Sequence, residues 1–287
     1  MFAMRTGGFI GSATLALVVG FASPAVAVAQ ETAAHAPKVA ARAAYVVDSS
    51  GTVLFGKRET DRFPVASLVK VMTAYVVLRE ARLSDTITIT SADVKYGSRG
   101  GATTAGLKPG ERLTVRDLLY ALLLPSAADA ANALARRYGP GRTAFVAKMN
   151  QAARSLGLED TRYTNTDGMP DPSPGHSTAV DQAKLAQHML ESSTFRTIVG
   201  TKVHTVAKSA VHRPHTWRNS NELLSRASGV LGVKTGYIKA AGYCLMFAGE
   251  RSGEQVVGVL LNGSTSESRF ATAERLLDYA GDRLAGR

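Results

Sequence analysis

Residues 67–79 read Ser67-Leu68-Val69-Lys70-Val71-Met72-Thr73-Ala74-Tyr75-Val76-Val77-Leu78-Arg79, a stretch that is apolar on nearly every face of an α-helix. A surface helix carries an apolar stripe on one side only, whereas a helix that is apolar all round is buried. The stretch therefore predicts a central helix around which the rest of the chain packs. With 287 residues, the chain is long enough to build a sizeable core of this kind.

Strands are predicted before this helix, and helices followed by further strands after it. Residues 43–47 and 52–55 form a predicted hairpin, since Asp48-Ser49-Ser50-Gly51 between them is typical of a turn. Capping patterns at 114–117 and 126–129 each indicate the start of a helix. The remaining predicted elements are helices over 115–123, 127–138, 143–156, 178–191 and 268–284, an irregular loop over 158–176, and strands over 230–234, 243–249 and 255–261.

This order of elements predicts an α/β protein of the α+β type. We expect one antiparallel sheet built from both ends of the chain, with an inserted all-helical part. The sheet part comprises about 43–63 and 200–287, and the helical part about 64–199. A cleft between the two parts is a natural place for a functional site.

The first thirty residues have the pattern of a secretory signal. Arg5 gives a positive start, apolar and small residues fill 8–21, and Ala27-Val28-Ala29 is a typical cleavage site. We expect cleavage after Ala29, with Ala27 as second choice, so that 1–29 are removed and 30–42 form a flexible lead-in. The alternative is an uncleaved membrane anchor, for which the apolar run is short. Because no later segment is apolar enough to span a membrane, we predict a secreted, extracytoplasmic protein without a stable membrane anchor.

Charge and cysteine content narrow the range of partners. The net charge is +11, and for an exported protein the natural counterparts are anionic wall polymers or anionic lipid rather than nucleic acid. The basic residues are scattered, so an ordinary soluble basic surface is an equal alternative. Cys244 is the single cysteine, which excludes an internal disulfide. Its strand-like surroundings indicate a small buried hydrophobic residue rather than a thiol nucleophile.

A candidate nucleophile and base lie together at the start of the buried helix. Ser67 and Lys70 are three residues apart and therefore share a helix face. A neutral lysine amine accepts a serine proton when burial or positive neighbours lower its pKa. The alternative is a capping serine beside a surface lysine, because the pattern S-x-x-K is common by chance.

A second polar group follows a predicted strand. Lys234 and Thr235 precede Gly236, and a glycine at a strand end lets another backbone or a ligand approach closely. The ammonium and hydroxyl groups suit a carboxylate. Taken alone, this is an ordinary end of a strand. Together with Ser67-x-x-Lys70, and with Ser126 at a helix start between them, it matches the motif set of penicillin-recognising enzymes.

The wider sequence resembles the low-molecular-mass D-alanyl-D-alanine carboxypeptidases of the serine β-lactamase and penicillin-binding protein superfamily, over about 43–284. The stretches that carry the resemblance are 64–74, 118–126, 161–165, 219–224, 234–237 and 240–244. The resemblance implies a β-lactamase/transpeptidase-like fold without cofactor or metal. It also implies a peptidoglycan stem peptide ending in D-Ala-D-Ala as substrate, and β-lactams as covalent inhibitors.

The resemblance further implies a role for each motif residue. Ser67 attacks the carbonyl between the two D-alanines, Lys70 is the general base, and Ser126 passes a proton to the leaving amine. The substrate-binding residues that it implies are Lys234, Thr235, Gly236 and Tyr237. The lysine and threonine hold the terminal carboxylate, and the backbone N–H groups of Ser67 and Tyr237 form the oxyanion hole. The acyl-enzyme then passes to water, as in a carboxypeptidase, or to an amine, as in a transpeptidase.

The sequence departs from this family at one position. The family's middle motif is S-x-N, whereas this chain has Ser126-Ala127-Ala128, and Asn132 lies one turn too far along to replace the amide. A catalytically weak penicillin-binding or wall-binding protein is therefore one alternative, although a pure binder needs no nucleophile and base. A serine β-lactamase is another. Glu159 lies in about the right region for it, but its surroundings lack the E-x-x-L-N pattern of class A enzymes.

Overall fold

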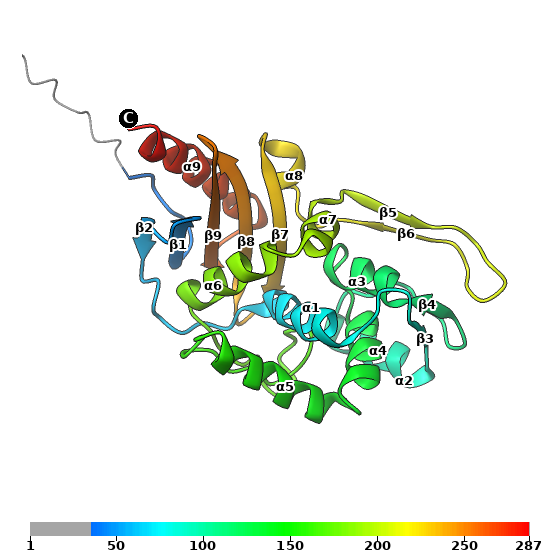
Figure 1. Ribbon diagram of the computed structural model, residues 1–287. Coiled ribbons are helices and arrows are strands. Elements are labelled where there is room, and N and C mark those ends of the chain that lie inside the picture. The colour runs from blue at the N-terminus through cyan, green and yellow to red at the C-terminus, as the bar shows by residue number, and fades with distance from the viewer. Residues whose placement is uncertain (1–35, 287) are drawn as a thin grey trace, which may run out of the picture. The chain divides into compact units, whose positions relative to one another are not determined.

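The computed structural model describes residues 36–286, which fold around a five-stranded antiparallel sheet (Figure 1). The strand order is β2-β1-β9-β8-β7, so strands from both ends of the chain lie side by side. Their bounds are Ala43–Asp48 (β1), Val53–Lys57 (β2), Val230–Ile238 (β7), Gly242–Arg251 (β8) and Glu254–Gly263 (β9). The predicted α+β architecture and the N-terminal hairpin are confirmed. The predicted signal peptide, 1–29, and the lead-in as far as residue 35 lie outside the described residues.

Helices fill most of the chain between β2 and β7. They are Val69–Glu80 (α1), Ser91–Gly97 (α2), Val115–Leu123 (α3), Ala128–Tyr138 (α4), Arg142–Ser155 (α5), Ala179–Leu190 (α6), Ser193–Gly200 (α7) and Leu223–Arg226 (α8), with 3-10 turns at Ala66–Leu68 (η1) and Arg99–Gly101 (η2). A last helix, Ser266–Leu284 (α9), follows β9. The first nine residues of α1 are all buried, as the apolar stretch predicts. α1 packs against α3, α4, α5 and α6, which makes it the centre of the helical part.

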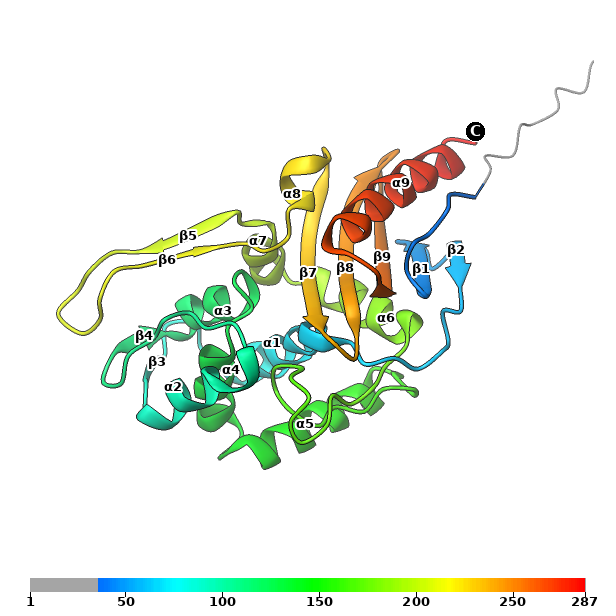
Figure 2. The ribbon, with the colours of Figure 1, turned by 180° about the vertical axis from the view of Figure 1, so that it is seen from behind.

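Helices cover both faces of the large sheet, because alternate residues of a strand point to opposite sides. On one face, Leu245 and Phe247 of β8 share an apolar cluster with Phe270 and Leu277 of α9, and Figure 2 shows α9 lying across this face. On the other face, Met246 belongs to the main core together with residues of α1 and α6. Both ends of the chain therefore contribute to the core that supports α1.

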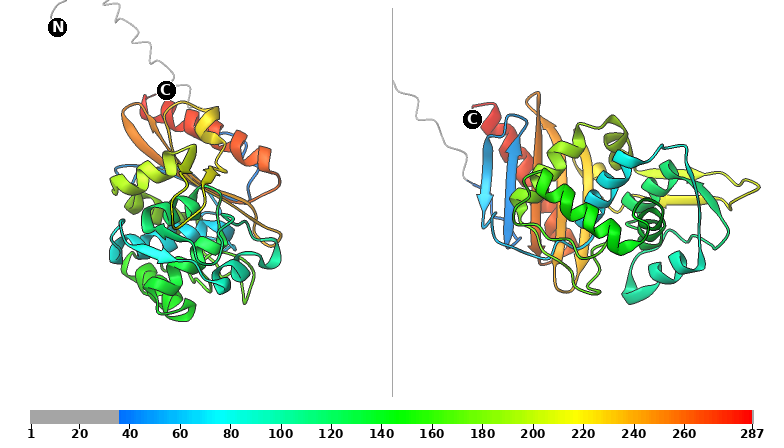
Figure 3. Two further views of the ribbon diagram at one scale, coloured as in Figure 1. Left: turned by 90° about the vertical axis from the view of Figure 1, so that its right-hand side faces the viewer. Right: turned by 60° about the horizontal axis from the view of Figure 1, so that its bottom comes forward.

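Two small antiparallel sheets, each of two strands, lie outside the predicted strands. They are Thr86–Thr88 (β3) with Arg112–Thr114 (β4), and Val203–Val206 (β5) with His215–Arg218 (β6). Strands of three or four residues show too little alternation to be recognised from the sequence. The β5–β6 hairpin projects away from the large sheet (Figure 3). Tertiary contacts hold its base: His204 stacks on Tyr120 with ring centroids 3.7 Å apart, and Trp217 Nε1 donates to Ala105 O over 3.0 Å.

The two predicted helix caps have different outcomes. At the start of α3, Thr114 Oγ1 accepts the N–H of Asp117 over 3.1 Å, as a cap does. The predicted cap at 126–129 is wrong, because α4 has no side-chain cap and Ser126 Oγ has no hydrogen-bond partner within residues 36–286. Asp129 instead accepts the N–H of Ala105 over 2.9 Å. A buried carboxylate needs donors, and here the loop before β4 supplies them.

Candidate active site

Ser67 lies in η1, the tight turn that leads into α1. The turn is bent sharply, with Ala66 at φ +49°. Lys70 follows in the first turn of α1, and its Nζ lies 3.1 Å from Ser67 Oγ. Lys70 is only 2% exposed, so this lysine does not extend into solvent as a surface lysine would. The structure thus brings together the hydroxyl and the amine that the sequence predicts on one helix face.

Two glycines let neighbouring segments approach the Ser67 turn. A Cβ on Gly168, which has φ +82°, would lie 1.9 Å from Ala66 O. A Cβ on Gly236 would lie 3.1 Å from Ser67 N. The loop that contains Gly168 and the strand β7 therefore both flank the turn, and a larger residue at either position would push them away from the serine.

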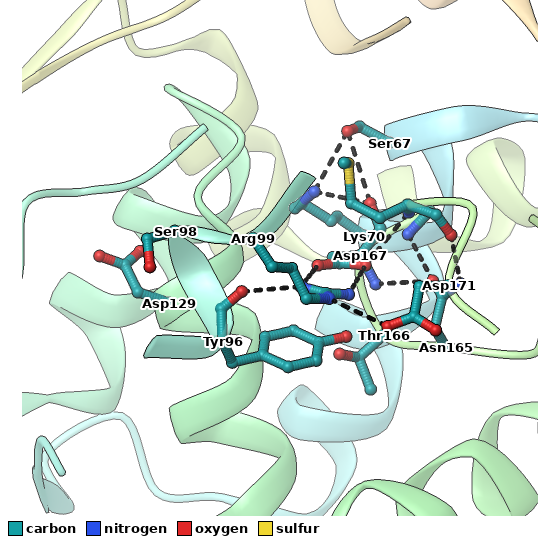
Figure 4. A network of polar contacts seen from close by, with 12 residues as sticks. Ser67, Lys70, Tyr96, Ser98, Arg99, Asp129, Asn165, Thr166, Asp167 and Asp171 are labelled. Atoms are coloured by element: carbon teal, nitrogen blue, oxygen red, sulfur yellow. Dashed lines mark hydrogen bonds and ion pairs between the residues drawn. The ribbon is translucent and has the colours of Figure 1, made fainter. Parts of the chain in front are cut away.

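The Lys70 amine is held by the main chain of the 158–176 loop. Nζ donates to Asp167 O over 2.7 Å, and Ser67 Oγ lies 3.5 Å from the same carbonyl (Figure 4). Burial lowers the pKa of Lys70 to about 8; the charges of Asp167 and Asp129 oppose this change, and that of Arg99 adds to it. A lysine with this pKa is about one-tenth neutral at pH 7, which gives a general base at working pH.

Asp167 and Arg99 form an ion pair beside this lysine. Arg99 Nη1 lies 3.1 Å from Asp167 Oδ2, and Nη2 lies 3.3 Å from Oδ1. The sequence pattern singles out neither residue, because they come from separate segments, 68 positions apart, that no spacing rule connects. The sequence feature that could have drawn attention to Asp167 is the pair Asp167-Gly168. This pair is typical of a tight turn, but it does not indicate which residues the turn contacts.

Ser126 lies in the turn between α3 and α4. It has φ +70°, is 9% exposed, and its hydroxyl has no hydrogen-bond partner within the described part of the chain. Ala128, at the start of α4, is fully buried, and its side chain offers no polar group. The amide of Asn132 is engaged elsewhere, since Nδ2 donates to Asp93 Oδ1 over 2.7 Å. The serine hydroxyl is therefore buried and unpaired among the described residues, and the amide of Asn132 on α4 is not free to accompany it.

Lys234 lies on β7, the edge strand that flanks the Ser67 turn. It is 1% exposed, and its Nζ donates to Thr235 O over 2.9 Å. Burial lowers the pKa of Lys234 well below its usual range, and the positive charges of Lys70 and Arg269 lower it further. Buried cations close enough to repel one another need an anion to balance them. This end of the site is therefore suited to a carboxylate.

Three further side chains complete this end of the site. Ser220 Oγ lies 2.6 Å from Thr235 Oγ1 and fixes where that hydroxyl points. Arg269 of α9 donates to the carbonyl of the K-T-G glycine over 3.3 Å. Tyr237 is 52% exposed, with its ring centroid 4.4 Å from that of Tyr243. Ser220 lies in a stretch that carries the family resemblance, whereas Arg269 looks like an ordinary surface charge on an amphipathic helix.

Other features bear on the kind of site. Cys244 is buried, as predicted, and burial raises the pKa of its thiol to about 11. Within residues 36–286, no group of three or more His, Cys, Asp or Glu side chains is arranged to hold a metal ion. In the same range, no helix combines the length and apolar character that crossing a membrane requires.

Comparison with known proteins connects this geometry with one family. A family model described as D-alanyl-D-alanine carboxypeptidase matches residues 30–265. A D-alanyl-D-alanine carboxypeptidase of Streptomyces sp. strain K15 is 38% identical over 289 residues, covering 96% of this chain and 95% of that protein. Another, of Mycobacterium tuberculosis, is 35% identical over 223 residues, covering 76% and 73%. The crystal structure of the Streptomyces K15 DD-transpeptidase matches with a TM-score of 0.81 at 39% identity, covering 85% of this chain and 97% of that chain.

Proposed function

Because the chain belongs to the D-alanyl-D-alanine carboxypeptidase family, and is therefore a serine peptidase that acts on peptidoglycan, we propose that Ser67 is its nucleophile and Lys70 its general base. The observation that carries this proposal is the 3.1 Å contact between Lys70 Nζ and Ser67 Oγ, made by a buried lysine whose pKa is lowered to about 8. A serine hydroxyl is a weak nucleophile until a nearby base accepts its proton. These two residues form such a pair.

The reaction has two halves. In acylation, the neutral Lys70 amine accepts the Ser67 proton while Oγ attacks the carbonyl between the two D-alanines of a stem peptide. The tetrahedral intermediate then collapses and the C–N bond breaks. Ser126 gives its proton to the departing amine of the terminal D-alanine and receives in turn the proton held by Lys70, which leaves the lysine neutral. In deacylation, a water molecule or an amine attacks the ester, and Ser67 regains its proton.

The strand β7 supplies the groups that bind and polarise the substrate. Lys234 and the hydroxyl of Thr235 hold the terminal carboxylate, in keeping with their location among cations. We assign the oxyanion hole to the backbone N–H groups of Ser67 and Tyr237, and the close approach of Gly236, the residue before Tyr237, to the Ser67 turn supports this assignment. These two donors form the oxyanion hole, and each such donor typically contributes about 3–4 kcal/mol to lowering the barrier.

The alternatives find less support in the site. A catalytically weak penicillin-binding or wall-binding protein is favoured by Ala128, which offers no amide, but it leaves the pairing of Ser67 with Lys70 unexplained. A class A β-lactamase uses a glutamate to activate the deacylating water. Glu159 is exposed, and Asp167 contacts Lys70 through its backbone carbonyl while its carboxylate pairs with Arg99. A carboxypeptidase therefore remains the better interpretation.

The proposal also covers the molecule that accepts the acyl group and the place where the protein acts. The Streptomyces K15 relative is named both a D-alanyl-D-alanine carboxypeptidase and a DD-transpeptidase, so we take hydrolysis as the main reaction and transfer to an amine as the second. The secretory pattern of 1–29 supports export, with a mature chain that begins near Gln30 and acts outside the cytoplasm. β-Lactams acylate Ser67 as analogues of the D-Ala-D-Ala end.

A single incubation tests the proposal. The purified chain from Gln30 onward is mixed with a peptide ending in D-Ala-D-Ala, with and without glycine as amine acceptor, and the products are identified by mass. We expect release of D-alanine in both cases and a glycine-terminated peptide when glycine is present. A protein that is labelled by benzylpenicillin yet releases no D-alanine would instead be a weak binder. Rapid hydrolysis of penicillin would point to a β-lactamase.

A further inference from the structure

A buried carboxylate lies beside the candidate base. The side chain of Asp167 is fully buried, and its backbone carbonyl accepts the Lys70 Nζ hydrogen bond at 2.7 Å. The negative charge of Asp167 raises the pKa of Lys70, because a neighbouring anion favours the ammonium form. An ammonium group has no lone pair and cannot accept the Ser67 proton. Asp167 therefore holds Lys70 in place through its backbone carbonyl, while the charge of its carboxylate reduces the neutral fraction of that lysine.

Arg99 counteracts this anion. Its guanidinium contacts both carboxylate oxygens of Asp167, at 3.1 and 3.3 Å (Figure 4). Two-point pairing of this kind is the strongest contact that arginine makes with a carboxylate. The positive charge of Arg99 also lowers the pKa of Lys70 directly. Both effects keep more of the lysine neutral.

The surroundings of Arg99 keep its charge in a defined place. Its guanidinium carbon lies 3.3 Å from the centroid of the Tyr96 ring, and Nη1 donates to Tyr96 O over 2.8 Å. Arg99 begins the short turn η2, in which no residue is buried, yet only 20% of its side chain is exposed. Arg142 contacts the same ring, with its guanidinium carbon 4.3 Å from the centroid, but it is not among the charges that act on Lys70. Arg142 therefore offers a matched control for Arg99.

We propose that Arg99 is a positioning residue for acylation, which acts through Asp167 to keep the Lys70 amine in the form that accepts the Ser67 proton. This inference rests on the proposed roles of Ser67 and Lys70. The other charged groups that act on or face Lys70 are Asp129 of α4 and Lys234 of β7. Backbone N–H groups already hold the Asp129 carboxylate, and Lys234 is itself basic. The Asp167 carboxylate accepts one backbone N–H, that of Met169 over 3.2 Å, and its cationic partner is Arg99. Arg99 also faces the exposed carboxylate of Asp171, at 3.7 Å. Asp167 is thus the anion whose charge, next to the base, Arg99 balances.

The test is the pH dependence of Ser67 acylation by benzylpenicillin, followed by mass, in the full mature chain. In the wild type the acylation rate rises with pH through a midpoint near 8, where half of Lys70 is neutral, and levels off at higher pH. Arg99→Met removes the cation that pairs with the Asp167 carboxylate, so the midpoint moves to higher pH, and each unit of that movement lowers the rate at pH 7 about tenfold. Asp167→Asn keeps the backbone carbonyl and removes the anion, so the midpoint moves to lower pH. The double variant falls between the two single ones.

A merely structural role of Arg99 predicts a different pattern. Loss of packing would lower the acylation rate at every pH without moving the midpoint. In the double variant, Asp167→Asn would then lower the rate further instead of offsetting the effect of Arg99→Met on the midpoint. Arg142→Met removes a cation from the same tyrosine ring and is expected to leave the midpoint unchanged. Thermal unfolding of each protein reports whether it is folded. If Arg99→Met does not fold, the Asp167→Asn protein tests the proposal instead. Movement of its acylation midpoint to lower pH supports the proposal, and an unchanged midpoint overturns it.

Two results separate this inference from the proposed function. Folded Arg99→Met and Asp167→Asn proteins that label at Ser67 with wild-type midpoints would overturn the role of Arg99 and leave the nucleophile assignment intact. A wild-type protein that is never labelled at Ser67 would instead overturn the assignment of Ser67 and Lys70, on which the inference depends.

Discussion

Asn132 Nδ2 donates to Asp93 Oδ1 over 2.7 Å, and Arg136 Nη2 contacts the other oxygen of the same carboxylate over 2.9 Å. Asp93 is fully buried and needs several donors, and the N–H and hydroxyl of Thr90 supply two more, each at 2.8 Å. Asn132 is thereby committed to the contact between α2 and α4. It does not supply the amide that the S-x-N motif of this family places at position 128, where this chain has alanine.

Restoring that amide is expected to speed peptide turnover. An asparagine side chain can accept from the Lys70 ammonium and donate to a substrate carbonyl, and alanine can do neither. We predict that Ala128→Asn raises peptide hydrolysis on the order of tenfold, the effect of one hydrogen bond of about 1.5 kcal/mol in the transition state. Release of D-alanine measures it.

The stability of the Ala128→Asn protein is the control for this prediction. Ala128 is fully buried at the start of α4, so a larger side chain must find room there, and a lower melting temperature would reveal strain. A variant with the melting temperature of the wild type that hydrolyses peptide no faster would show that the missing amide does not limit the rate of this enzyme.

Replacing the nucleophile is expected to abolish covalent labelling. Benzylpenicillin should add its mass to a peptide that contains Ser67, and Ser67→Ala should lose this adduct completely, because Lys70 Nζ contacts that hydroxyl at 3.1 Å. Digestion followed by mass spectrometry locates the label. Ser126→Ala serves as the comparison, since it removes the proposed proton relay and leaves the nucleophile in place. An adduct that persists in Ser67→Ala would refute the assignment.

Loss of the Lys234 cation is expected to affect only substrates with a free terminal carboxylate. A charge-assisted contact of this kind is worth roughly 1.5–3 kcal/mol, which corresponds to about 10- to 150-fold in kcat/KM. Lys234→Ala should therefore slow hydrolysis of a D-Ala-D-Ala peptide by that factor and hardly affect its amidated counterpart. Steady-state kinetics on the two peptides provide the comparison. Equal losses on both would mean that Lys234 supports the structure instead.

A methyl group at Gly168 is expected to disrupt the Ser67 turn. The added Cβ would lie 1.9 Å from Ala66 O in a backbone at φ +82°, so the loop and the turn must separate. We predict that Gly168→Ala lowers the free energy of unfolding by about 2–5 kcal/mol and slows acylation. Gly253→Ala is the matched control, with φ +80° but nothing within 4 Å of the added Cβ, and should cost only about 1–2 kcal/mol. Equal losses in urea unfolding would contradict the close approach.

Much of the fold could be predicted because it depends on local periodicity. The all-round apolar character of 67–79 is sufficient to bury α1, and the turn after Asp48 is sufficient to form the first hairpin. The predicted helices of the middle region fall within about two residues of α3 to α6, since their apolar spacing repeats over several turns. The two-stranded sheets β3–β4 and β5–β6 could not be predicted, because strands of three or four residues show too little alternation.

The pairing of Ser67 with Lys70 follows from the sequence, because helix geometry brings residues three apart onto one face. Tertiary structure alone decided what surrounds that pair. Asp167 reaches Lys70 across 97 positions of chain, and Arg99 reaches Asp167 across 68. Contacts at such separations depend on how loops close and pack, which no local pattern encodes. The contact between Lys70 and Ser67 could therefore be predicted from the sequence, whereas the charges that adjust the pKa of Lys70 became visible only in the folded chain.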